Sequence, residues 1–269
     1  MGLVSIRIHP VKACRGLEVE RAWVERRGLR DDRRWMLVDD DGRCVSQRTF
    51  PGLTLVRATL EGDAIVLHRD GCAPCALPRR PTSGARTRVS VWSWQGDAIA
   101  FDEARAWFRR AVGQALRPVF LPDDVARPVS EEYGHAGDLV SFADAFPLLL
   151  ASSSSLAVLN DRLRARGAAL VTMERFRPNV VIDGAEPFAE EASRAVRIGA
   201  LRFRAPKTCD RCAVPNVDPD TGLTAPEPIA TLATFRRRDG AVWFGQNLVP
   251  DGEGEIRVGD EVVLEGASA

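Results

Sequence analysis

Histidine is scarce in this sequence, and no histidine lies near an obvious serine or cysteine nucleophile motif. Only His9, His68 and His135 occur among the 269 residues. Hydrolases of the Ser-His-Asp and Cys-His types need such a histidine as a base, so the sequence disfavours both classes. It also lacks a Gly-x-Gly-x-x-Gly run that opens a helix and a Gly-x-x-x-x-Gly-Lys-Ser/Thr loop. Common dinucleotide and P-loop sites therefore have no support.

Long apolar runs and an excess of either charge are missing as well. No apolar stretch reaches the roughly 18 residues of a membrane-spanning helix. The first eight residues, MGLVSIRI, alternate like a strand rather than like a secretion signal. Basic and acidic residues number 37 each, so no overall field attracts nucleic acid or anionic membranes. We expect a cytoplasmic protein with neither nucleic acid nor membrane as a partner.

The six cysteines are too few and too scattered for a disulfide framework in a chain of this length. A chain this long can bury a sufficient apolar core without such crosslinks. In a reducing compartment these residues are metal ligands, reactive thiols or packing side chains.

The order of predicted elements indicates a mainly β protein with some helices, in the α+β class. Turns at 40–42 and 61–63 lie between alternating segments and predict hairpins in an antiparallel, barrel-like domain over residues 1–120. Apolar residues at helical spacing predict a helix over 101–112. A loop rich in proline and acidic residues at 121–137 marks the boundary, and a second domain covers 121–269.

The second domain begins with another predicted helix and then returns to strands. Serines offer N-caps for a helix over 152–167, with Leu156, Leu159 and Leu163 as its buried stripe and Gly167 as its end. Strands are predicted within 177–183, 195–206, 241–250 and 255–266. The last of these segments, EIRVGDEVVLEG, is typical of the closing strand pair of a barrel.

Two Cys-x-x-Cys pairs occur, at 72–75 and at 209–212. Their long separation disfavours a shared four-thiolate zinc site, because zinc ribbons usually join their halves over roughly 12 to 20 residues. Lys207 and Arg211 flank Cys209, and neighbouring cations lower a thiol pKa, which favours a soft metal ligand or a nucleophile. Loop cysteines beside solvated charges are the alternative, and the spacing leaves both open.

Two basic clusters suggest a binding site for a phosphorylated small molecule. Arg175, Arg177 and Asn179 precede a buried strand, and a guanidinium matches the geometry of a phosphate. Lys12, with Arg33 and Arg34, would add positive charge if the first strand folds back. The alternative for each cluster is a solvated strand end.

In chain order, the segments VKACRG, DDRRWMLV, RFRPNVVIDG and KTCDRCAVPNVDPDTG resemble those of the MOSC family. The resemblance is to its two-part members, which include the mitochondrial amidoxime-reducing component and bacterial relatives. It implies an N-terminal MOSC β-barrel domain, a MOSC β-barrel domain with flanking helices, and the molybdenum cofactor, Mo-molybdopterin. By resemblance Cys209 is the metal ligand and catalytic residue. The cofactor-binding residues so implied are Lys12, Arg33, Asp144, Arg177, Asn179 and Cys209.

The resemblance further implies a molybdenum-dependent oxidoreductase that reduces N-hydroxylated small molecules such as amidoximes, hydroxylamines and hydroxylamino nucleobases. No cysteine follows Cys212 to build an iron–sulfur cluster. We therefore expect electrons from a separate redox protein of the ferredoxin, flavodoxin or cytochrome type, with its reductase. One alternative is a carrier or maturation protein for the cofactor or its sulfur. Another is a zinc-stabilised β protein without catalysis.

Overall fold

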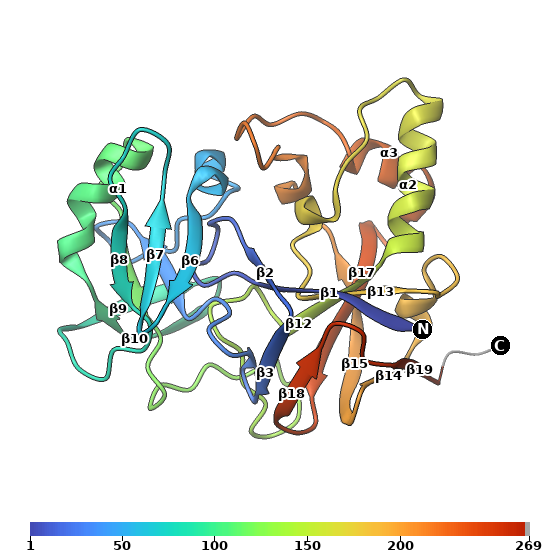
Figure 1. Cartoon of the computed structure of the whole chain (residues 1–269), viewed down its shortest axis with the longest axis horizontal. Helices are drawn as coiled ribbons and strands as arrows, with labels where there is room; N and C mark the ends of the chain where they lie inside the picture. The colour runs from blue at the N-terminus through green and yellow to red at the C-terminus, as the bar shows by residue number, and fades with distance from the viewer. Residues whose placement is uncertain (267–269) are drawn as a thin grey trace.

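Strands dominate the computed structural model, which describes residues 1–266. Strand residues make up 39% and helical residues 18%, and the predicted α+β class with mainly β structure is confirmed. Figure 1 shows two groups of strands side by side, one beneath α1 and the other beneath α2 and α3. We call the first group the small lobe and the second the large lobe.

A nine-stranded sheet organises the large lobe. All its neighbouring strands are antiparallel except β12 and β13, which are parallel. Parallel neighbours need a crossover, and α2 (Ser153–Ala165) provides it. The strands in spatial order are β19 (Val262–Glu265), β14 (Ala195–Ile198), β15 (Leu201–Asp210), β17 (Ala241–Pro250), β12 (Leu148–Ser152), β13 (Val180–Asp183), β1 (Gly2–Ile8) and β2 (Leu17–Val19), with β16 (Arg237–Arg238) on β17.

The predicted helix over 152–167 is confirmed, although its serines do not cap it as expected. Ser152 is the N-cap residue, but its hydroxyl bonds that of Ser154 rather than a backbone amide. Leu159 and Leu163 are fully buried against α3 (Ile229–Arg236) and the sheet. Among the helices of residues 1–266, none has the length and apolar character to cross a membrane.

The first strands of the chain join the second half of the sequence. β1 and β2 lie in the large sheet, and β3 (Arg21–Glu25), which also pairs with β4 (Gly28–Leu29), pairs with β18 (Gly254–Arg257). The sheets therefore cross the predicted boundary between residues 120 and 121. A register shift in β1 between Leu3 and Ser5 lets both Leu3 and Ile6 face the core, because a bulge changes which face alternate residues point to.

The prediction that residues 255–266 form a closing strand pair is wrong. β18 pairs with β3, whereas β19 pairs with β14, so the two strands belong to different sheets. Alternation of apolar residues specifies which face of a strand is buried, but it does not specify the partner strand.

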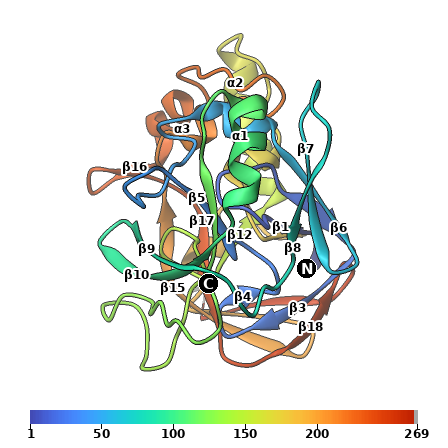
Figure 2. The same cartoon turned by 90° about the vertical axis from the view of Figure 1, so that its left-hand side faces the viewer.

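The small lobe has two further sheets and one helix. Its predicted helix is confirmed as α1 (Arg105–Val112), which buries Trp107 and Phe108 and which Figure 2 shows in front of this lobe. Of the two predicted hairpins, the one at 61–63 is confirmed, because the strands on either side of this turn pair with each other. The segments on either side of the turn at 40–42 pair only through an isolated bridge. The strands are β5 (Trp35–Val38), β11 (Arg117–Phe120), β10 (Trp94–Ala100) and β9 (Arg86–Val91) in one sheet, and β6 (Arg57–Glu61), β7 (Ala64–His68) and β8 (Cys75–Pro78) in the other.

A buried carboxyl group beside α2 makes stability depend on pH. Burial raises the pKa of Glu190 to about 7, although the Ser155 hydroxyl, which donates to Oε1 at 2.8 Å, partly opposes this. The folded state therefore favours the protonated form. This contribution to stability is full below the unfolded pKa of about 4.5 and is lost as pH rises through 7.

Replacing Glu190 with glutamine should remove this pH dependence. Relative to the variant, the unfolding free energy of the wild type should fall by about 3 kcal/mol between pH 4.5 and pH 8. Urea unfolding at both pH values measures the difference. Parallel pH profiles for the two proteins would show that Glu190 does not titrate in this range.

Candidate functional site

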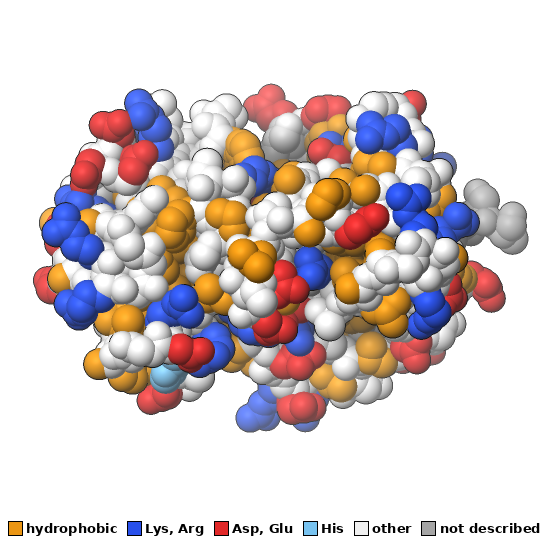
Figure 3. All heavy atoms as spheres, turned by 90° about the horizontal axis from the view of Figure 1, so that it is seen from above, with side chains coloured by type: hydrophobic (Ala, Val, Ile, Leu, Met, Phe, Trp, Pro, Cys, Tyr) orange, Lys and Arg blue, Asp and Glu red, His pale blue; other side chains and the backbone are white. Residues whose placement is uncertain are grey.

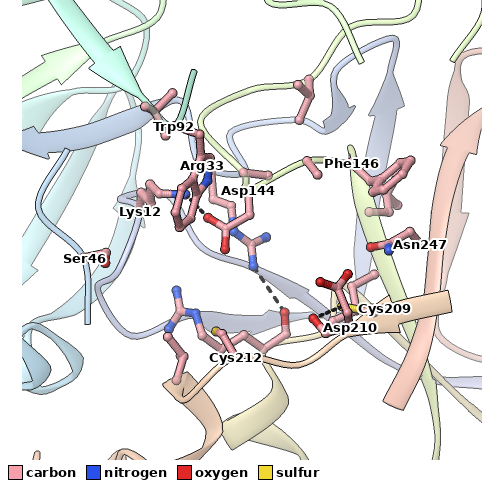
Figure 4. Close-up of a pocket in the computed structure, with 18 of the residues that line it drawn as sticks. Lys12, Arg33, Ser46, Trp92, Asp144, Phe146, Cys209, Asp210, Cys212 and Asn247 are labelled. Carbon is pink, nitrogen blue, oxygen red and sulfur yellow. Dashed lines mark hydrogen bonds and ion pairs between the residues drawn. The ribbon is translucent and has the colours of Figure 1, made fainter. Parts of the chain in front are cut away.

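One cleft of about 570 Å³ between the lobes is lined by all six residues that the sequence predicts for the site. Lys12 and Arg33 reach it from the segment between β1 and β5, and Asp144 from the loop before β12. Figure 4 shows Lys12, Arg33 and Asp144 together on one side and Cys209 and Asn247 on the other. Residues far apart in the sequence thus converge, while their individual roles stay predictions.

Cys209 lies at an irregular end of β15. The pairing of β15 with β17 shifts register between Arg204 and Lys207 and again between Thr208 and Asp210. Such bulges interrupt the alternation of a strand and re-aim side chains, and they are common beside functional sites. The second irregularity spans Cys209, whose side chain lines the cleft.

The expectation that two flanking cations lower the pKa of Cys209 is wrong. Burial raises the pKa of this thiol above its ordinary value, and Arg211 only partly offsets the effect, although its Nη1 lies 3.1 Å from Sγ. The Lys207 ammonium instead pairs with Asp210 at 3.3 Å and lies over the ring of Tyr133. Adjacency in the sequence did not bring this lysine to the thiol.

An ion-pair chain crosses the opposite side of the cleft. The buried Lys12 ammonium contacts Asp144 Oδ1 and donates to the carbonyl of Phe142 at 2.7 Å, while Arg48 Nη2 donates to Asp144 Oδ2 at 2.9 Å. Burial alone would raise the pKa of Asp144, but Lys12 and Arg48 hold it far below its usual range. Asp144 is therefore ionised and fixes both cations.

Arg33 and Asn179 form a second network at the base of the cleft. Arg33 donates to Asp32 at 2.6 Å and to Asn179 Oδ1 at 3.3 Å. The Asn179 amide also accepts from the Leu149 amide and donates to the Arg7 carbonyl. Most of the hydrogen-bonding capacity of Asn179 is thus used within the protein, which makes it a support for Arg33 and for the strand that follows.

Arg177 differs from the other cations of the cleft because, within residues 1–266, its guanidinium makes neither a hydrogen bond nor an ion pair. Its buried Nη2 has no partner. Burial, and after it the charge of Arg33, lowers the pKa of Arg177 to about 10. Arg177 is half-buried, and a cation with no counter-ion and one buried, unpartnered nitrogen is energetically unfavourable, so this position fits a bound anion.

The cleft concentrates positive charge and backbone strain in a protein of zero net charge. Figure 3 shows acidic and basic side chains interspersed over one face of the molecule. The cleft, by contrast, is lined by seven cationic side chains but only two carboxylates, those of Asp144 and Asp210. Four of its residues have positive φ, a conformation that often marks functional sites: Ala13, Arg33, Trp92 and Arg177. The seven cations are Lys12, Arg33, Arg48, Arg127, Arg177, Lys207 and Arg211.

Several residues from the predicted clusters lie elsewhere. Arg34 binds the Leu121 carbonyl and Asp123, and Arg175 pairs with Asp218 at 2.7 Å, so neither lines the cleft. Asp218 Oδ1 accepts from the amides of residues 220 and 221 and so shapes this loop.

The two cysteine pairs do not meet. The pair at 72 and 75 packs against the core of the small lobe, whereas the pair at 209 and 212 lines the cleft. In the described part of the chain no three His, Cys, Asp or Glu side chains are grouped as a metal site.

Sequence reasoning missed Arg48, Arg127, Trp92 and Trp94, which also line the cleft. Arg127 donates to the carbonyls of Ser141 and Ala143 and so holds the loop that carries Asp144. These residues occupy loops and a hairpin end without a motif, and only tertiary folding brings them to the site. No sequence signal marked them.

Comparison with known proteins places both halves of the chain. Residues 1–115 match the MOSC N-terminal beta barrel domain and residues 138–263 the MOSC domain. The chain is 33% identical over 283 residues to mitochondrial amidoxime-reducing component 1 of Homo sapiens, covering 98% of this chain and 83% of that protein. It is 26% identical over 291 residues to molybdenum cofactor sulfurase of Solanum lycopersicum, covering 98% of this chain and 36% of that protein. The crystal structure of the YUAD protein from Bacillus subtilis aligns with 97% of this chain and 93% of its own, at 10% identity and a TM-score of 0.42.

Proposed function

Because this chain belongs to the MOSC family and carries the N-terminal MOSC β-barrel domain, we propose that it is a molybdenum-cofactor-dependent reductase of N-hydroxylated compounds. Its relatives include amidoxime-reducing components and a molybdenum cofactor sulfurase, so a function tied to the molybdenum cofactor is supported. The reductase activity is the more specific part of the proposal, and it is based on the 33% identity with the amidoxime-reducing components across nearly the whole chain.

The observation that carries the proposal is the unpaired Arg177 guanidinium in the same cleft as Cys209. A pterin cofactor with a phosphate would offer an anion that Arg177 could bind and a metal that Cys209 could ligate. Arg177 would bind the anion, with Lys12 and Arg33 adding positive charge around it. The residues present therefore fit the cofactor.

The protein's own groups would bind and orient, while the cofactor would supply two-electron redox chemistry at a sulfur-ligated metal. Cys209 would contribute the protein ligand from the bulged end of β15, and Arg211, 3.1 Å from its sulfur, would orient it. Asp144 would keep Lys12 and Arg48 fixed at the cleft wall. Ordered side chains of this kind lower the entropy lost when a substrate binds.

The proposed net reaction cleaves an N–O bond. R–NHOH takes up two electrons and two protons and yields R–NH2 and water, so that the nitrogen is reduced. A separate electron-donor protein of the ferredoxin, flavodoxin or cytochrome type would supply the electrons. We further propose that the protein acts in the cytoplasm.

Turnover separates this function from that of a cofactor or sulfur carrier, the alternative suggested by the sulfurase relative. Protein produced with molybdate should contain molybdenum by mass spectrometry and should convert benzamidoxime to benzamidine with reduced methyl viologen. Molybdenum without turnover would favour the carrier. Stoichiometric zinc without molybdenum would contradict both functions.

A further inference from the structure

Trp92 occupies a backbone position at the cleft where glycine would be expected. Val91 pairs with Trp94, so Trp92 and Ser93 form a two-residue turn between β9 and β10. Trp92 has φ +54°, and turns with positive φ strongly favour glycine, asparagine or aspartate. A bulky side chain in this conformation is strained. The turn therefore carries a tryptophan at a position whose backbone conformation glycine would adopt with less strain.

The indole is exposed, yet its orientation is fixed. Trp92 is 58% exposed and lines the cleft. The Arg48 guanidinium carbon lies 4.5 Å from its ring centroid, and Asp144 holds Arg48 through the 2.9 Å ion pair. One face of the ring is therefore covered by a cation. More than half of the side chain stays exposed, so the opposite face is available to a ligand.

The position of Trp92 suits contact with a substrate rather than with the core. Figure 4 shows Trp92 beside Lys12, Arg33 and Asp144, on the other side of the cleft from Cys209. A flat ring held there can stack on an aromatic ligand while another part of that ligand points toward Cys209. Stacked aromatic pairs gain free energy beyond the area that they bury.

We propose that Trp92 is a stacking platform that makes the cleft selective for substrates whose N-hydroxylated group is attached to a planar aromatic ring. The inference that the substrate carries an N-hydroxylated group rests on the proposed function, whereas recognition of its ring by Trp92 does not. A saturated ring of similar size presents no π face to the indole, so planarity rather than size should decide the preference.

A matched substrate pair tests this preference. Benzamidoxime and cyclohexanecarboxamidoxime carry the same reacting group on a planar and on a saturated six-membered ring. In Trp92→Ala, the kcat/KM ratio of the aromatic to the saturated substrate should fall about tenfold. Trp92→Phe should keep most of the ratio. Trp23→Ala is the control, because Trp23 is also exposed and stacked by an arginine but lies in β3, outside the cleft. An unchanged ratio in Trp92→Ala would overturn the proposal.

Binding of the corresponding amidines keeps the two proposals separable. Calorimetry on the full chain should show that benzamidine binds more tightly than cyclohexanecarboxamidine, and that Trp92→Ala abolishes the difference. If neither amidoxime is turned over but this pattern holds, the aromatic site stands and the reductase function fails. If both amidines bind the wild type and Trp92→Ala alike, the aromatic site fails even where turnover is found.

The Tm of a Trp92→Gly variant distinguishes a ligand-binding tryptophan from one that only stabilises the fold, because the two roles predict opposite changes. Trp92→Gly relieves the backbone strain at positive φ, so its Tm should rise by about 2–4 °C while the preference for the aromatic substrate is lost. A lower Tm together with an unchanged preference would mean that Trp92 serves the fold alone.

Discussion

Cys209→Ala should reduce bound molybdenum and turnover of N-hydroxylated substrates to background. The substitution removes the thiolate proposed to complete the sulfur coordination of the metal, and alanine offers no donor atom in its place. Molybdenum by mass spectrometry and turnover with an artificial reductant measure the two losses. Because Cys209 lies at a strand end that lines the cleft, we expect only a small change in stability.

Cys212→Ala is the matched control for the ligand assignment. Cys212 also lines the cleft and is three positions away, but the resemblance gives it no ligand role. Its variant should keep molybdenum at the level of the wild type. Full molybdenum content in Cys209→Ala, or a complete loss in Cys212→Ala alone, would refute the assignment of Cys209.

Arg177→Met should move cofactor affinity and stability in opposite directions. Removing a cation that pairs with a buried anion costs about 2–5 kcal/mol of binding, so affinity should fall at least about thirtyfold. Without cofactor the same half-buried guanidinium is unpaired, and its Nη2 is buried without a partner. Its removal should therefore raise the unfolding free energy of the cofactor-free chain by about 1–3 kcal/mol. Denaturant titration and the cofactor content of the purified protein test the two effects.

Arg175→Met is the corresponding control for this second variant. Arg175 lies two residues away, but it pairs with Asp218 outside the cleft. Its loss should weaken the loop at 218–222 and lower stability without changing cofactor affinity. If Arg177→Met lowered the stability of the cofactor-free chain, the inference of an uncompensated charge would be wrong.

The sequence identifies six residues that line the cleft, because each of them lies in a recognisable segment. Their roles as metal ligand or cofactor anchors stay predictions. Cys209 stands in the Cys-x-x-Cys run, and Lys12 and Arg33 stand in motifs that resemble those of one family. Arg48 and Trp92 meet only in three dimensions, where the guanidinium of one covers the ring of the other. No pattern of apolar spacing encodes that contact.

The same limit explains the two errors about local environment. The flanking cations of Cys209 suggested a lowered thiol pKa, but burial is a property of the folded cleft and it dominates. The alternation in residues 255–266 identified β18 and β19, but their partners depend on the path of the whole chain. Local patterns predict elements, whereas environment and pairing follow from tertiary structure.

The place of β1 in the large sheet has a consequence for biosynthesis. Ile6 pairs with Val180, so the first strand leaves the ribosome long before its partner exists. At a synthesis rate of about 5–20 residues per second, the roughly 170 residues between them take about 10–35 seconds. During that time β1 has an unpaired edge, which is prone to pair with other chains. Nascent chains of this protein should therefore depend on chaperones until residue 183 has emerged.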